Sequence, residues 1–200
     1  MATPNRNDTQ PQKGDALLIV DVQNDFLPGG SLEVPRGDEV VPVLNSYLLA
    51  FIAKNLPVYA TRDWHPERHC SFRAQGGPWP PHCVAETRGA EFAEALQLPP
   101  SAVIISKATT AEQDAYSGFQ GTNLDQQLRA ANIHRLFIGG LATDYCVLNT
   151  VRDAQRNGYK VLLLADAIRA VEVQAGDGLI AEEEMVRHGA RCITVDRISA

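Results

Sequence analysis

Three side chains of the sequence could together perform nucleophilic chemistry, namely Asp21, Lys107 and Cys146. A carboxyl group close to apolar residues can have a raised pKa and act as a base, and a deprotonated thiol attacks carbonyl carbons. Taken singly, Asp21 and Lys107 have ordinary explanations as a loop-capping acid and a solvated lysine. Taken together, an acid, an amine and a thiol could supply a base, a positive charge and a nucleophile to one site.

Cys146 follows a turn that contains Gly139, Gly140 and Thr143, and it lies just inside a predicted helix. A helix N-terminus carries a partial positive charge and unpaired backbone N–H groups. Both favour a thiolate, and the same N–H groups could hold an oxyanion. The alternative is a small buried core residue, as many cysteines are. Position alone does not decide between these two interpretations.

The irregular segment 62–89 contains Asp63, His65, His69 and His82 within twenty residues. On an extended backbone Asp63 and His65 point to the same side. Three imidazoles and one carboxylate suit Zn²⁺, Fe²⁺ or Mn²⁺ and leave room for water or substrate. Each histidine alone is better explained as a surface residue of a polar loop. The group as a whole predicts one divalent metal ion.

Four aromatic side chains lie in the same irregular segments: Phe26, Trp64, Trp79 and Tyr116. Such side chains could form a flat pocket for a ring. They could equally anchor loops through small local cores, and we expect that role for Trp64. The sequence therefore predicts an aromatic pocket close to the metal ligands.

Short apolar runs that alternate with amphipathic stretches must position these side chains. The predicted strands are residues 16–20, 58–61, 103–106, 135–138, 161–164 and 192–195. The predicted helices are residues 38–54, 122–131, 144–157 and 178–188. Most of the strands lack polar alternation, as strands buried on both faces do. The pattern predicts an α/β fold, a single-domain three-layer α/β/α sandwich with a mainly parallel six-stranded sheet.

Ligands of such sheets bind beyond the carboxyl ends of the strands. Asp21, residues 62–65, Lys107 and residues 139–146 each follow a predicted strand. They form one site if the first and fourth strands are neighbours, which the sequence does not establish.

The chain has 200 residues and a formal net charge of −6. We expect a flexible tail over residues 1–14 and one domain over residues 15–200. The net charge argues against nucleic-acid and anionic-membrane partners. The sequence has no secretory signal, so we expect a cytoplasmic protein with reduced thiols, although four cysteines could form two disulfides. Cys70 and Cys83 are rival metal ligands beside His69 and His82.

Five segments resemble the nicotinamidases of the isochorismatase-like cysteine hydrolase superfamily. They are Ile-Val-Asp-Val-Gln-Asn-Asp-Phe at 19–26, Arg-Asp-Trp-His-Pro at 62–66, Trp-Pro-Pro-His at 79–82, Tyr-Ser-Gly-Phe at 116–119 and Gly-Leu-Ala-Thr-Asp-Tyr-Cys-Val at 140–147. The first and last are typical of the superfamily, whereas the Asp-Trp-His and Trp-Pro-Pro-His segments are typical of its metal-binding members. The resemblance extends over about residues 16–195.

This resemblance implies hydrolysis of nicotinamide, and also of pyrazinamide, by a triad of Asp21, Lys107 and Cys146. It implies a cis peptide between Leu141 and Ala142, with the amides of Ala142 and Cys146 holding the oxyanion. The implied metal ligands are Asp63, His65, His69 and His82. The implied substrate contacts are Phe26, Trp79, Tyr116 and Leu141. The sequence departs from the family at Ala108, where a glycine is usual, so the shape of the nearby pocket rim stays open.

Three other functions stay open on the sequence alone. The first is another amidase of the same superfamily, acting on carbamoyl or ureido substrates. The second is a metal-dependent binding or regulatory protein without catalysis, against which the complete triad argues. The third is a dinucleotide-binding dehydrogenase, but Asp-Val-Gln-Asn at 21–24 stands where its glycine-rich turn would be. The sequence predicts neither the identity of the metal nor the oligomeric state.

Overall fold

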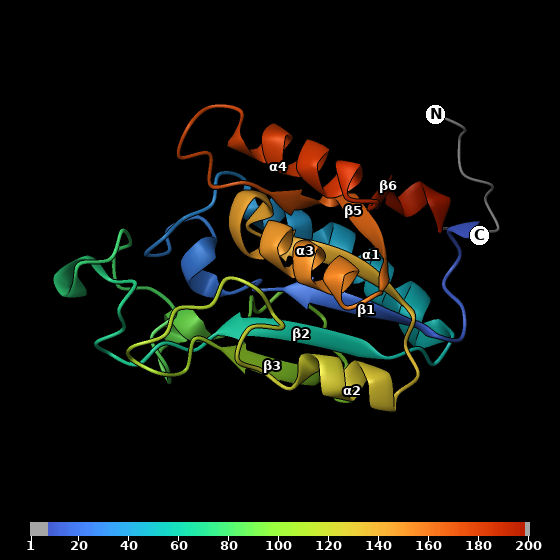
Figure 1. The fold of residues 1–200 in the computed structure, drawn as a ribbon, viewed down its shortest axis with the longest axis horizontal. Helices are drawn as coiled ribbons and strands as arrows, with labels where there is room; N and C mark the ends of the chain where they lie inside the picture. The colour runs from blue at the N-terminus through green and yellow to red at the C-terminus, as the bar shows by residue number, and fades with distance from the viewer. Residues whose placement is uncertain (1–7, 199–200) are drawn as a thin grey trace.

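The computed structural model describes residues 8–198, which contain one six-stranded sheet of parallel strands (Figure 1). Its strands are β1 (Asp15–Val20), β2 (Val58–Asp63), β3 (Val103–Lys107), β4 (Arg135–Leu141), β5 (Lys160–Arg169) and β6 (Arg191–Ile193). Their order across the sheet is β3-β2-β1-β4-β5-β6. The six predicted strands and the predicted parallel sheet are confirmed.

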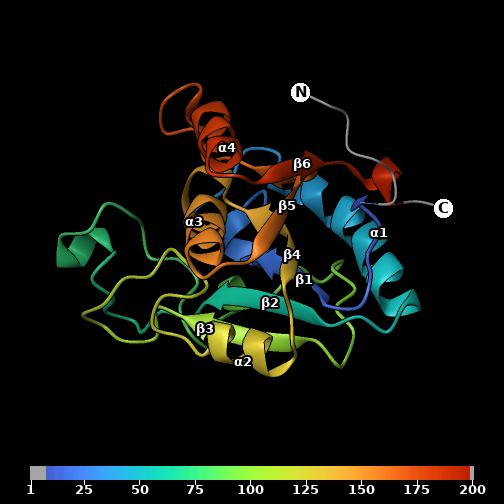
Figure 2. The ribbon, with the colours of Figure 1, turned by 45° about the vertical axis from the view of Figure 1, so that its right-hand side comes forward.

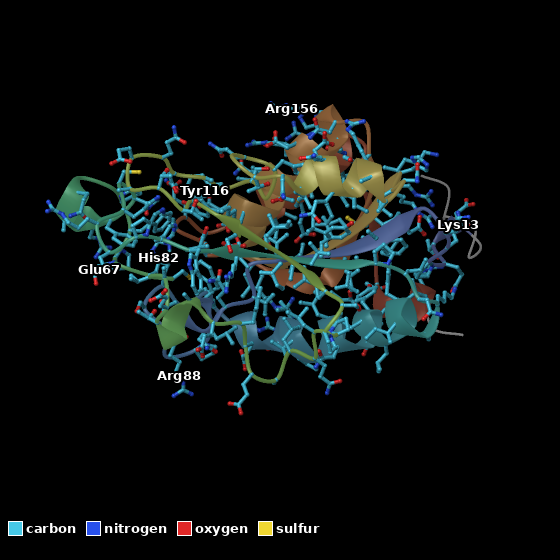
Figure 3. The ribbon with its side chains drawn as sticks, turned by 90° about the horizontal axis from the view of Figure 1, so that it is seen from below. Lys13, Glu67, His82, Arg88, Tyr116 and Arg156 are labelled. Atoms are coloured by element: carbon cyan, nitrogen blue, oxygen red, sulfur yellow. The ribbon has the colours of Figure 1, made fainter. Side chains whose placement is uncertain are left out.

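Four α-helices of the described residues cover the two faces of the sheet. They are α1 (Val40–Ala53), α2 (Leu124–Ala130), α3 (Leu148–Arg156) and α4 (Asp177–Arg187). Helix α1 lies on one face, and α2, α3 and α4 lie on the other (Figures 2 and 3). The predicted three-layer α/β/α sandwich is therefore confirmed. The predicted helix at 144–157 begins as a π-helical turn, Thr143–Val147, before it continues as α3.

Strand β1 is buried on both faces along its whole length. Leu17 packs in the same cluster as Phe51 of α1, whereas Leu18 packs in the same cluster as Leu128 of α2. Each fully buried side chain of this kind contributes about 1.5–3 kcal/mol to stability. Burial against helices on both sides explains why the run 16–20 is apolar without alternation.

The order in which successive strands are added to the sheet reverses between β1 and β4. From β1 the chain adds β2 and then β3 on one side, and from β4 it adds β5 and then β6 on the other. Val20, the last residue of β1, pairs with Thr61 of β2 and with Gly140 of β4. The adjacency that the predicted site requires is therefore present, and the crevice at such a switch point is where sheets of this type bind ligands.

Gly140 allows β4 to approach β1 closely. It has a φ of 126°, and a Cβ built on it would lie 2.1 Å from the carbonyl oxygen of Val20. We expect Gly140→Ala to lower the free energy of unfolding by about 3 kcal/mol or more, because strain adds to a backbone clash. Gly158→Ala is the matched control, since Gly158 has a φ of 89° but nothing within 4 Å. Urea denaturation followed by circular dichroism measures both, and equal losses would refute the clash.

Half of the predicted tail, residues 1–7, lies outside the described residues. Within residues 8–14, Thr9 is buried and its hydroxyl donates to the carbonyl of Arg197 (3.1 Å). Arg135 donates to the carbonyl of Gln10 (2.9 Å) and pairs with Asp15. These contacts join residues 9 and 10 to the domain.

Residues 62 and 63 of the predicted irregular segment belong to β2, and residues 64–89 lie beyond its carboxyl end, at one end of the molecule (Figure 1). Two short 3-10 helices, Arg73–Gln75 and Arg88–Ala90, interrupt the stretch between β2 and β3. Figure 3 labels His82 and Tyr116 at this end and Lys13 at the opposite end. None of the helices within residues 8–198 has the length and apolar character needed to cross a bilayer.

Candidate active site

The side chains of Asp21, Lys107 and Cys146 meet at the carboxyl edge of the sheet. The Lys107 Nζ atom lies 3.0 Å from Asp21 Oδ2 and 3.5 Å from Cys146 Sγ. It also donates to the carbonyl oxygen of Ala115 at 2.9 Å. Asp21 is 0% exposed, Lys107 1% and Cys146 6%. One buried ammonium group thus connects the acid and the thiol that the sequence analysis grouped.

Asp21 has the environment of a base. Burial raises the pKa of its carboxyl group, and the Lys107 ammonium opposes that rise only in part. The hydroxyl of Thr61 donates to Asp21 Oδ1 at 2.6 Å and orients the group. A carboxylate with a raised pKa takes a proton more readily than a solvated one.

The Cys146 thiol lies in an environment that disfavours its thiolate form. Burial raises the pKa of Cys146 well above its ordinary value, and Lys107 opposes the rise without reversing it. Hydrogen bonding to Asp21 raises this pKa further. Desolvation of the buried sulfur therefore opposes the stabilisation of a thiolate that the helix N-terminus was expected to give. The sulfur needs a base to become a nucleophile, and Asp21 is in contact with it.

The turn that carries Cys146 starts at a cis peptide between Leu141 and Ala142, as predicted. The carbonyl oxygen of Ala142 accepts hydrogen bonds from the amides of Tyr145 (3.2 Å) and Val147 (3.0 Å). The turn therefore folds back over residue 142. Ala142 and Cys146 both line the same cavity, where their amides could face an oxyanion.

Lys107 has a second carboxylate partner, Asp63 Oδ1. Burial alone would lower the pKa of Lys107, but the carboxylates of Asp21 and Asp63 outweigh it and hold the pKa well above its ordinary value. The lysine therefore stays charged. From the sequence, Asp63 was expected only as a metal ligand. Its contact with Lys107 arises because the last residues of β2 and β3, Asp63 and Lys107, pair in the sheet, and the sequence does not show this pairing.

Asp63, His65 and His82 offer metal-ligand atoms that all lie within 4.8 Å of one another. His65 Nε2 is buried and has no hydrogen-bond partner, while its Nδ1 lies 2.9 Å from the His82 carbonyl. His82 Nδ1 lies 2.8 Å from the carbonyl of Pro80. A carbonyl partner requires Nδ1 to carry the proton, so Nε2 of each ring keeps its lone pair for a metal.

The protonation state of these histidines also fits metal binding. Burial lowers the pKa of His65 to about 3, and burial likewise lowers the pKa of His82. Both rings are therefore neutral near pH 7, as metal ligands must be. The donor set of one carboxylate and two imidazoles suits a divalent ion such as zinc.

His69 lies beside this group, and its ring stacks on that of His65 with centroids 4.2 Å apart. Its Nδ1 lies 2.7 Å from Ser71 Oγ and its Nε2 3.0 Å from the carbonyl of Gln113. Its ligand atoms group with His65 and Asp114 and not with His82. Both nitrogens of His69 therefore have protein partners, unlike those of His65.

A cavity with about 410 Å³ of empty space, including its open mouth, lies over Cys146. Phe26, Trp79 and Tyr116 line it, as predicted, and Trp79 Nε1 donates to the hydroxyl of Tyr116 at 3.0 Å. Tyr145 is a further aromatic wall, edge-on to Trp79 with centroids 5.0 Å apart. The lining residues that the sequence analysis missed are Leu32, Ser71, Asp114, Ala115, Tyr145 and Val171. Only Tyr145 carried a signal in the sequence, since it immediately precedes Cys146, the candidate nucleophile.

Two other expectations about the pocket have clear outcomes. Leu141 is fully buried in the core cluster that contains Val34, and it does not line the cavity. Trp64 packs against the hydrophobic core cluster, as expected for a loop anchor, and the Arg62 guanidinium lies 3.6 Å from its ring centroid. Ala108 has a φ of 51°, a conformation that favours glycine.

Cys70, Cys83, Cys146 and Cys192 are all free thiols, so the two possible disulfides are absent. Burial raises the pKa of Cys83 well above its ordinary value, and Cys192 is exposed. Only Cys146 combines a contact with Lys107 and a place in the cavity wall.

Comparison with known proteins gives a consistent result. The family model for the Isochorismatase domain matches residues 15–197. A nicotinamidase of Escherichia coli (strain K12) is 39% identical, covering 90% of this chain and 94% of the relative. The crystal structure of the pyrazinamidase of Pyrococcus horikoshii in complex with zinc has a TM-score of 0.87 and 49% identity, covering 90% and 99% of the two chains. The structure of PnC1 from L. infantum in complex with nicotinate has a TM-score of 0.86 and 35% identity, covering 96% and 98%.

Proposed function

The chain belongs to the isochorismatase family, and we propose that it hydrolyses nicotinamide to nicotinate and ammonia. The observation that carries this proposal is the single Lys107 ammonium that contacts Asp21 and Cys146 beneath a cavity walled by aromatic rings. Nicotinamide supplies both a carboxamide for the thiol and a flat ring for the cavity. The relatives that act on nicotinamide or bind nicotinate support this substrate.

The reaction proceeds through a thioester on Cys146. Asp21 removes the thiol proton, the sulfur attacks the carboxamide carbon, and the amides of Ala142 and Cys146 stabilise the oxyanion. Asp21 then returns the proton to the leaving nitrogen, so ammonia departs and the acyl group stays on sulfur. Asp21 next takes a proton from water, whose oxygen attacks the thioester carbon; the C–S bond breaks to release nicotinate, and Asp21 returns its proton to the Cys146 sulfur. Lys107 keeps Asp21 oriented and stabilises negative charge during both steps.

Asp63, His65 and His82 would hold one divalent metal ion, with His69 beside them. When bound, the ion supplies a Lewis acid for the ring nitrogen of the substrate, directly or through water. Zinc, iron and manganese all suit these ligands. The protein's own contribution is to keep His65 and His82 neutral and to hold the ring between Phe26 and Trp79 while Cys146 reacts.

The ring nitrogen should control substrate choice. Benzamide has the carboxamide and shape of nicotinamide but lacks that nitrogen, so a group of the site loses its partner. We expect benzamide to have a kcat/KM lower by on the order of 100-fold or more, measured as ammonia release. His82→Ala should remove most of this preference, whereas His188→Ala, an exposed histidine, should retain it. Equal kcat/KM values for benzamide and nicotinamide in the metal-loaded protein would instead favour a general amidase.

Pyrazinamide keeps a ring nitrogen at the same position and should also be hydrolysed. Nicotinate is a precursor in pyridine nucleotide salvage, which is the role that this activity would serve. Four free thiols suit a reducing compartment, and we infer a cytoplasmic location. The partners required by this proposal are the small-molecule substrate and the metal ion alone.

A further inference from the structure

Gln23, two residues after the catalytic base, is fully buried and holds the backbone of Asp63. Its Nε2 donates to the carbonyl oxygens of Asp63 (2.8 Å) and Ala90 (2.9 Å). Its Oε1 accepts from the amide of Asp63 at 2.8 Å. The side chain therefore contacts both peptide groups of Asp63, as a neighbouring strand would. Asp63 is thus fixed at the point where its carboxylate meets Lys107 and the candidate metal site.

Asp25, four residues after the base, contacts the segment that carries His82, one of the two histidines of the candidate metal site. Its Oδ2 accepts from the amide of Cys83 at 2.7 Å, and its Oδ1 accepts from the amide of Ser31 at 3.2 Å. Cys83 directly follows His82, and its carbonyl accepts from the amide of His65 at 3.0 Å. One carboxylate therefore contacts the residue that joins the two histidine-bearing segments.

Gly89 covers the Asp25 carboxylate. A Cβ built on Gly89 would lie 2.1 Å from Asp25 Oδ2 and 2.5 Å from Oδ1. Asn24 strengthens this arrangement, because its side-chain amide donates to the carbonyl of Arg88 at 2.8 Å. The carboxylate is thus held between three segments, and any side chain at position 89 would displace it.

We propose that Gln23 and Asp25 are positioning residues that set the geometry of the metal site. Gln23 fixes Asp63, and Asp25 fixes His82 against His65. The short segment that supplies the base Asp21 therefore also aligns the metal ligands. This inference rests on the proposed function in one respect, which is that Asp63, His65 and His82 bind a metal ion.

A role in positioning differs measurably from a role in folding. Metal affinity responds to small displacements of ligands, and loss of partners that orient ligands typically weakens binding by about 10–100-fold. Loss of a buried hydrogen bond lowers the stability of the fold without selecting one site. Metal affinity and the Co²⁺ absorption spectrum therefore test the proposal, and thermal stability is recorded beside them.

The test uses Asp25→Asn and Gly89→Ala in the metal-free full chain. Asp25→Asn keeps the volume but turns one acceptor into a donor facing an amide. Gly89→Ala keeps the charge and displaces the carboxylate. In competition with a chromophoric chelator, we expect both variants to bind Co²⁺ about 10–100-fold more weakly than the unaltered chain, with an altered visible spectrum. The rate of Cys146 alkylation by iodoacetamide should stay within about 2-fold, because the alterations spare the triad.

Asp38→Asn is the matched control, since Asp38 is an exposed acid in the same connection between β1 and α1. It should bind Co²⁺ like the unaltered chain. Unchanged affinity and spectrum in both Asp25→Asn and Gly89→Ala would overturn the proposal, even if both variants were less stable. Failure of both to fold would overturn it too, because the contacts would then serve the fold as a whole. If the unaltered chain binds no Co²⁺, the inference fails together with the metal site, while ammonia release from nicotinamide tests the hydrolase activity separately.

Discussion

Cys146→Ala is expected to leave no hydrolysis of nicotinamide above background, a loss in kcat on the order of 10⁵-fold or more. The proposed thioester would form on this sulfur, and alanine offers no atom that could carry the acyl group. Ammonia release measures the loss. Mass spectrometry of the intact chain, quenched during turnover, should detect the acyl adduct only when Cys146 is present.

Cys83→Ala is the matched control, because Cys83 is also buried and burial also raises the pKa of its thiol. It should retain activity, as should Cys70→Ala and Cys192→Ala. Burial of a thiol alone would then be insufficient for catalysis, and the contact of Cys146 with Lys107 and the cavity would be decisive. Full activity of Cys146→Ala would rule out the thioester mechanism.

Asp21→Asn is expected to lower kcat on the order of 10³-fold or more, because an amide cannot take the thiol proton. Combined with Cys146→Ala, it should add almost nothing, since both residues serve the same step. Ammonia release from the two single variants and the double variant measures this. A near-normal kcat in Asp21→Asn would show that Asp21 is not the base.

Asp15→Asn separates this effect from damage to β1. Asp15 is buried at the opposite end of the same strand and pairs with Arg135. The substitution should lower stability and leave kcat close to normal. A similar fall in kcat for Asp15→Asn and Asp21→Asn would attribute both losses to the strand.

The sequence by itself determined the elements and the set of reactive residues. Continuous apolar runs such as residues 16–20 mark strands covered on both faces, and their alternation with helices leaves a parallel sheet. The carboxyl ends of parallel strands share one edge, so Asp21, Lys107 and Cys146 were grouped before any contact was known. The cis peptide at Leu141–Ala142 followed from the family resemblance and is present.

The tertiary structure alone decided which of these groups meet and in which state. Strands β1 and β4 are adjacent in the sheet although they lie far apart in the chain, and no local sequence pattern predicts this pairing. Other contacts between distant segments give Lys107 its second carboxylate partner, Asp63. They also bury Leu141 in the core, whereas it was expected in the pocket wall. The helix N-terminus favours a thiolate, yet burial by distant segments raises the pKa of the Cys146 thiol well above its ordinary value. Periodicity is a property of consecutive residues, whereas desolvation and ion pairing depend on what the rest of the chain packs around a group.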